Sequence, residues 1–132
     1  MNSLNFDSGV KEYAINDDPN RIIRVNPSDF GIVARAKKAK EALDKLRVDP
    51  GEEHLSEALD AMDKAVREQI DAIFGEGTSQ TAFGDVNCTS LANGNPIFLN
   101  FLNAIIPEVE RVVEEEKKKS DAKIQKYTSR VR

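Results

Sequence analysis

The sequence predicts an α+β fold that is mainly α, with a small N-terminal β-hairpin or meander packed on three main helices. Within residues 3–25, apolar and polar residues alternate between turn-forming residues, which is the period of β-strands. After residue 26, apolar residues recur every three or four positions, which is the period of helices. A chain of 132 residues has the usual length of a single domain. We therefore expect one domain over residues 1–132, divided into an extended or β region at 1–26, a helical core at 27–113 and a charged tail at 114–132 that is either helical or frayed.

Composition and charge narrow the class of protein. Apolar residues make up 39% of the chain and charged residues 32%, which suits a soluble helical domain. The net charge of −4 argues against nucleic acid as a partner, because nucleic-acid binders are normally basic. The single cysteine, Cys88, permits no internal disulfide, so a reducing cytoplasm is the expected location. The N-terminus lacks the features of a signal peptide, and no apolar stretch is long enough to cross a membrane.

The N-terminal region is predicted to contain two or three short strands. Leu4 and Phe6 alternate with polar residues before a turn at residues 7–9. Further strands are expected within residues 10–15 and 21–25, separated by a run of Asn, Asp and Pro. A hairpin of this size is marginal by itself in water. It therefore either caps the helical core or offers an exposed strand edge to a partner.

Two helices are expected between residues 26 and 74. The first has Asn26 or Ser28 as its N-cap and runs to about Arg47. The second has Asp49 as its N-cap, with Pro50 in the first turn, and ends at Phe74. The residues expected to face the core are Ile32, Ala36, Ala39, Leu43 and Leu46 in the first helix, and Leu55, Leu59, Met62, Val66, Ile70 and Ile73 in the second.

A Gly-rich linker follows at residues 75–95. Thr78 is expected to cap a short helical turn that ends at Phe83, and residues 86–91 to form another. The glycine spacing does not match a phosphate-binding loop. Cys88 is expected to be an inert buried thiol rather than a nucleophile, since neither His nor a cation lies near it in the sequence.

No catalytic, cofactor or metal site is predicted. His54 is the only histidine and has no Cys or second His at ligand spacing, so a surface position is expected. The acidic residues of the second helix are expected to form a solvated face. They include Glu57, Asp60, Asp63 and Asp71. We therefore expect a protein that is not an enzyme.

The longest apolar stretch lies between Asn95 and Val113. Asn95 suits an N-cap and Pro96 the first helical position, while Pro107 predicts a kink inside the helix. The apolar positions cover most of the circumference of the helix: Ile97, Phe98, Phe101, Leu102, Ile105, Ile106, Val109, Val112 and Val113. Such a helix is covered on several sides, by its own domain, by a second subunit or by a client protein. The residues that follow are charged, and the Glu114–Lys118 and Glu115–Lys119 spacings favour helical ion pairs.

Several stretches carry a family resemblance. They are NPSDF at residues 26–30, FGEGTSQTAFGDVN at 74–87, LANGNPIFLNFLNAIIPEVERV at 91–112 and DAKIQKYTSR at 121–130. In this order they resemble the tail assembly chaperones, small proteins encoded in the tail-gene clusters of long-tailed phages and prophages. The similarity covers most of the chain and is most specific at residues 74–87 and 95–127.

The resemblance implies a function without catalysis. A protein of this kind binds the apolar helical tape-measure protein in the bacterial host cytoplasm and keeps it soluble until tail-tube subunits polymerise around it. It also contacts the major tail protein. The wide apolar stripe makes Phe98, Phe101, Ile105 and Ile106 the expected partner-binding residues. Self-association into a homo-oligomer is also compatible with the sequence. The alternative function is that of a non-enzymatic regulatory or toxin-neutralising helical binding protein.

Overall fold

The predicted fold class is confirmed. The computed structural model describes the chain except residues 27–28, 30, 47–50, 52 and 132, with side chains described up to residue 124. It is 61% helix and 10% strand. The elements in chain order are β1 (Lys11–Ala14), the 3-10 turn η1 (Ile15–Asp17), β2 (Ile22–Val25), α1 (Gly31–Asp44), α2 (Leu55–Phe74), α3 (Thr78–Phe83), β3 (Leu91–Ala92), β4 (Asn95–Pro96) and α4 (Ile97–Val131).

Strands β1 and β2 form the N-terminal hairpin. They pair antiparallel, with Tyr13 opposite Ile23 and Lys11 opposite Val25. The alternation of β2 places Ile23 and Val25 in the core and leaves Arg24 in solvent. A third strand around Leu4 is not formed, because no partner strand lies beside residues 1–10 in the described chain.

Helix α1 begins later than predicted. It starts at Gly31, and the carboxylate of Asp29 accepts the Gly31 N–H at 3.0 Å. The alternative cap, Ser28, lies outside the described residues. An anion suits this position, because the first N–H groups of a helix lack intrahelical acceptors. Four of the five predicted core positions are buried; the fifth, Leu46, lies beyond the helix and is exposed.

Helix α2 has the predicted end but not the predicted start. It begins at Leu55, with His54 at the N-cap position. The expected cap, Asp49–Pro50, lies outside the described residues. The helix ends at Phe74, and the Gly75 N–H donates to the Asp71 carbonyl at 2.9 Å. Val66, Ile70 and Phe74 supply its buried face.

The linker is folded against the helices. Helix α3 confirms the short helix at Thr78–Phe83, although its N-cap is Gly77 rather than Thr78. The helical turn expected over residues 86–91 is wrong, because this segment makes turns that lead into a small β3–β4 hairpin. Asn95 and Pro96 are therefore in a strand, not at a helix start.

Helix α4 starts at Ile97 because the linker supplies its caps. The Ile97 N–H donates to the Ser90 carbonyl at 2.9 Å, and the Phe98 N–H donates to the Cys88 carbonyl at 3.0 Å. Main-chain acceptors thus satisfy two N–H groups that an N-cap side chain would otherwise serve. The helix is continuous through Pro107, and the kink expected there stays a prediction.

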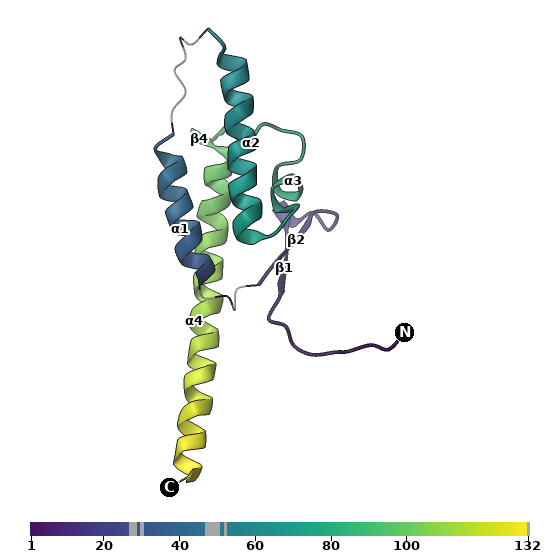
Figure 1. Cartoon of the computed structure of the whole chain (residues 1–132), viewed down its shortest axis with the longest axis vertical. Coiled ribbons are helices and arrows are strands. Elements are labelled where there is room, and N and C mark those ends of the chain that lie inside the picture. Colours follow the sequence, from purple (N-terminus) through teal and green to yellow (C-terminus); the bar gives the residue numbers. More distant parts are fainter. Residues whose placement is uncertain (27–28, 30, 47–50, 52, 132) are drawn as a thin grey trace.

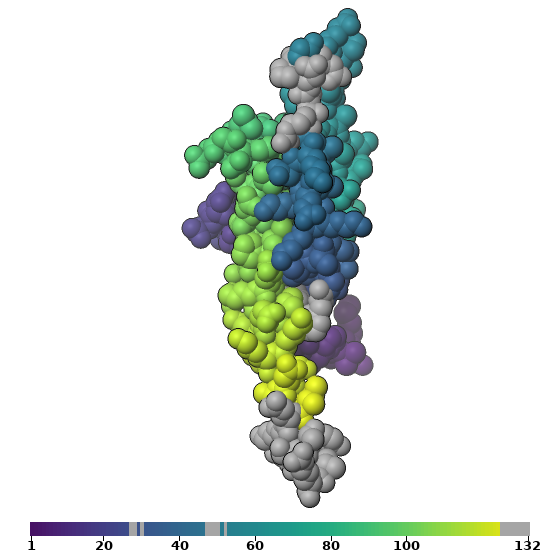
Figure 2. Space-filling model, turned by 90° about the vertical axis from the view of Figure 1, so that its left-hand side faces the viewer, coloured from purple at the N-terminus to yellow at the C-terminus, as the bar shows by residue number. Residues whose placement is uncertain are grey.

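Two parts of α4 have different surroundings. We call Ile97–Val113 the inner half and residues 114–131 the outer half. Helix α1 lies along the inner half, and the outer half projects beyond it (Figures 1 and 2). None of the helices described is long and apolar enough to cross a membrane.

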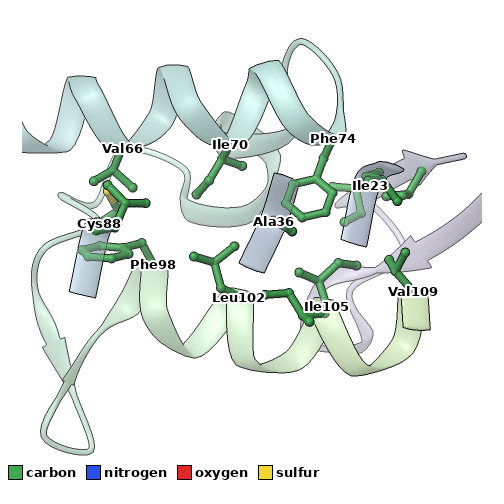
Figure 3. Packing of buried hydrophobic residues seen from close by; sticks show 14 of the residues in the cluster. Ile23, Ala36, Val66, Ile70, Phe74, Cys88, Phe98, Leu102, Ile105 and Val109 are labelled. Carbon is green, nitrogen blue, oxygen red and sulfur yellow. The ribbon is translucent and has the colours of Figure 1, made fainter. Parts of the chain in front are cut away.

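The chain itself covers the inner half. Side chains of α2 face those of α4 across the core, with Ala36 of α1 and Ile23 of β2 between them (Figure 3). Phe98, Leu102 and Val109 are almost completely buried. Of the three covers that the apolar stripe permits, the chain's own domain is therefore the one present along most of the stripe.

Candidate functional site

The expected partner-binding residues do not form one exposed surface. Phe98 is 1% exposed, and Ile105 and Ile106 are each 6% exposed. The other elements of the chain thus already cover three of the four residues, and their role in binding a partner stays a prediction. Phe101 is half-buried, and together with Ile105 it lines a hollow on the surface.

That hollow is a groove with a volume of about 440 Å³, which we call the hairpin groove. It lies between the N-terminal hairpin, α3 and the inner half of α4. Its floor is mostly apolar and follows α4 through Ile97, Phe101 and Ile105. The complete lining is Tyr13, Ala14, Ile15, Asn16, Ile23, Ala82, Phe83, Ala92, Ile97, Asn100, Phe101, Ala104, Ile105 and Glu108.

Small residues create the hollow and aromatic residues support it. Alanines at positions 14, 82, 92 and 104 lie around the lining, where larger side chains would fill the space. The Phe101 ring packs edge-on against Phe74 and Phe83, at centroid distances of 5.8 and 5.7 Å. Such edge contacts favour one orientation of the rings. The floor of the groove is therefore held by the core below it.

Arg21 joins two walls of the groove. Its Nε donates to the Thr81 carbonyl at 3.1 Å, and its guanidinium also donates to the Ala82 carbonyl. These carbonyls belong to the last turn of α3, where backbone acceptors lack intrahelical donors. One side chain in the loop of the N-terminal hairpin thus fixes the position of α3 relative to that hairpin.

One end of the groove is polar. The Tyr13 hydroxyl donates to Glu108 Oε1 at 3.5 Å, and Arg111 pairs with the same carboxylate. Burial and the neighbouring Glu108 carboxylate raise the pKa of Tyr13. The hydrogen bond from Arg111 holds the pKa of Glu108 below its ordinary value. The groove therefore ends in a neutral hydroxyl and an ionised carboxylate at neutral pH.

A hydrogen-bonded cluster on α2 anchors the linker beside the groove. Arg67 donates from Nη2 to the Gly84 and Val86 carbonyls, at 2.9 and 2.7 Å. Asp63 accepts from Arg67 Nε at 3.0 Å and from the Cys88 N–H at 2.7 Å. The Arg67 guanidinium also lies 5.5 Å from the centre of the Phe83 ring.

This cluster corrects the prediction of a wholly solvated acidic face. Glu57 and Asp60 are exposed as expected. Asp63 is instead enclosed by the linker, and the Asp71 carboxylate accepts the Ser79 N–H at 2.8 Å. The i, i+4 spacing of Asp63 and Arg67, next to a Gly-rich return of the chain, was the available sequence signal.

Cys88 and His54, the other residues with side chains suited to catalysis or metal binding, do not form a reactive site. Cys88 is fully buried, and burial together with the nearby Asp63 carboxylate raises the pKa of its thiol to about 12. The thiol is therefore protonated and inert, as predicted. His54 is exposed, with Glu57 at 3.8 Å. Among the described residues, no group of three or more His, Cys, Asp or Glu side chains is arranged to hold a metal ion.

Comparison with protein-family models gives no matching family, and comparison with curated proteins and with solved structures gives no match either. The function is therefore argued from the groove and from the residues that carry the family resemblance.

Proposed function

We propose that this protein is a tail assembly chaperone that binds apolar helical segments of a phage tape-measure protein in the hairpin groove. Binding is stoichiometric and involves no turnover. The supporting observation is an apolar groove alongside a helix that the chain has otherwise covered. The proposal places the protein in the bacterial host cytoplasm and includes the major tail protein as a second partner.

The dimensions of the groove suit a short stretch of client helix. Its α4 side runs from Ile97 to Glu108, which is about 16 Å at 1.5 Å of helix rise per residue. Three turns of an amphipathic helix have the same length and present anchors at positions i, i+4 and i+7. Phe101 lies near the middle of this stretch, and Glu108 provides a polar end.

Energetics then predict weak binding at each groove. Three buried Leu or Phe anchors contribute roughly 5–9 kcal/mol in total, at about 1.5–3 kcal/mol each. Loss of translational and rotational freedom costs an estimated 4–15 kcal/mol, so little affinity remains for one site. A long tape-measure protein is therefore held by many copies, each of which exchanges readily. Tail-tube subunits displace them by covering the same apolar client surface.

Co-expression with the tape-measure gene of the same cluster tests the proposal. The client is expected to be soluble and to co-purify with several copies of the wild-type chain. Ala104→Glu adds a charge to an exposed position in the groove and is expected to reduce recovery of the complex at least tenfold, since burying an unpaired charge is costly.

Ala65→Glu is the matched control, because Ala65 is an exposed helical alanine on α2 outside the hairpin groove. It is expected to bind the client as the wild type does. Equal client solubility with and without the protein, together with no recovered complex, would contradict the proposal.

A further inference from the structure

The first ten residues form an apolar arm outside the body of the chain. Residues 1–8 are all exposed, with Leu4 at 91% and Phe6 at 80% of their full accessible surface. Figure 1 shows this arm running away from the helices. In an extended chain, residues two apart lie on the same side, so Leu4 and Phe6 form one apolar edge.

A turn at the base directs the arm away from its own hairpin. Gly9 has a φ of 78°, a conformation that glycine adopts readily, and its N–H donates to Asp7 Oδ1 at 3.0 Å. The chain therefore changes direction immediately before β1. This confirms the turn that the sequence predicts at residues 7–9.

The apolar edge of the arm matches the floor of the hairpin groove. Leu4 and Phe6 are separated by about 6.6 Å in an extended chain, at 3.3 Å per residue. Ile97, Phe101 and Ile105 follow one another along α4 at intervals of about 6 Å. Two arm side chains can thus lie side by side along the groove, whose lining includes the small residues Ala82 and Ala104.

We propose that the arm of one copy of this chain docks in the hairpin groove of a second copy, with Leu4 and Phe6 against Phe101 and Ala104. The arm emerges beside its own groove, because β1 follows at Lys11 and Tyr13 already lines the groove. A reciprocal exchange of arms then closes a two-fold dimer.

The size of the contact supports a second copy as the occupant. The ten arm residues, 1–10, and the fourteen that line the groove give each subunit about two dozen interface residues. A standard protein interface involves about 20–30 residues on each side. The arm can also reach, since ten extended residues span about 33 Å, roughly twice the length of the groove. This inference concerns the protein without its client, since the arm and the client segment proposed above use the same groove and exclude each other.

Light scattering on the purified full-length chain is the test. The wild type is expected at twice the 14.7 kDa mass of one chain. The double variant Leu4→Ser/Phe6→Ser and the groove variant Ala104→Glu are each expected to raise the dissociation constant at least tenfold. Leu91→Ser and Ala65→Glu are the matched controls, because Leu91 is also 72% exposed and neither residue lines the groove. Both controls are expected to remain dimeric, and circular dichroism verifies the fold of every variant.

Mixing the two defective variants makes the test specific. The Ala104→Glu chain retains its arm, and the Leu4→Ser/Phe6→Ser chain retains its groove, so one intact contact forms only between unlike chains. A mixed dimer is expected, at reduced affinity. A wild type that stays at the mass of one chain at all concentrations overturns the proposal, and so does an assembly that both defective variants preserve. Because no client is present, failure here is independent of failure of the chaperone proposal.

Discussion

The two halves of α4 belong to one continuous helix but are stabilised in different ways. In the inner half, seven side chains are buried: Phe98, Leu102, Ile105, Ile106, Val109, Val112 and Val113. In the outer half, the side chains described up to residue 124 are almost all exposed. Glu116 and Lys119 form an ion pair there at 3.8 Å. Burial therefore fixes the inner half, whereas local helix propensity and weak pairs support the outer half.

The difference explains which parts of α4 are available for binding. A helix buried on several sides has few side chains left for a partner, and the hairpin groove is one place where apolar side chains of the inner half reach the surface. The outer half is accessible but polar. An apolar partner is therefore expected to bind beside the inner half and not along the tail.

The largest effect is expected in the centre of the inner half. Leu102 is fully buried, so Leu102→Ala is expected to lower the free energy of unfolding by about 2–5 kcal/mol, through lost burial and the cavity left behind. The equivalent change in the outer half, Ile124→Ala, removes a side chain that is 61% exposed and is expected to cost within about 0.5 kcal/mol. Urea unfolding of both variants measures the contrast. Similar losses at the two positions would mean that the tail is also packed, for example against another subunit.

The next largest loss of stability is expected when the contacts that hold the linker against α2 are removed. Arg67→Met retains the aliphatic part of the side chain but removes the hydrogen bonds to the Gly84 and Val86 carbonyls. An expected loss of about 1.5–3 kcal/mol follows, the usual range for hydrogen bonds to a charged group. Thermal unfolding is the measurement. Arg111→Met is the matched control, since its ion pairs lie on the surface and contribute about 0–1 kcal/mol. If the two variants lose the same stability, the hydrogen bonds from Arg67 to the linker contribute no more than a surface ion pair.

The contrast between the two halves also shows what sequence patterns predict. Periodicity identifies the inner half because burial imposes a strict repeat on Phe98, Leu102 and Val109. The hairpin and the short helix at Thr78–Phe83 are likewise local, so turn chemistry is sufficient to predict them.

Features that depend on distant contacts were missed. Asn95 has the sequence preference of an N-cap, yet the carbonyls of Cys88 and Ser90 cap α4 instead. Asp63 resembles a surface carboxylate until the linker closes over it. The hairpin groove joins residues from β1, α3 and α4, so its floor was predicted through Phe101 and Ile105 but its walls were not. The ion pair expected between Glu115 and Lys119 is replaced by Arg111–Glu115 at 2.6 Å and Glu116–Lys119.

The pH dependence of stability tests the contacts between Asp63 and the linker. Partial burial acts to raise the pKa of Asp63, but hydrogen bonds from Cys88 and Arg67 outweigh it and hold the pKa below its ordinary value. A carboxylate with a depressed folded-state pKa stabilises the fold above its unfolded-state pKa, and this contribution is lost as the pH falls through the folded-state value. Asp63→Asn is therefore expected to be less stable than the wild type at neutral pH and to lose less further stability below about pH 4. If the free energy of unfolding falls equally for the two proteins as the pH is lowered, ionisation of Asp63 does not contribute to stability.

Removing the whole tail is also expected to have a small effect. Truncation after Lys118 deletes most of the outer half, in which Ile124 is exposed and the described side chains add little buried apolar surface. The expected cost is within about 1 kcal/mol, since the inner half ends at Val113 and keeps every packing partner seen in the core. Far-UV circular dichroism is expected to lose only the signal of the deleted turns, and the melting curve is expected to stay cooperative. If the whole fold is lost on truncation, burial also extends to the outer half, through a neighbouring subunit that covers it.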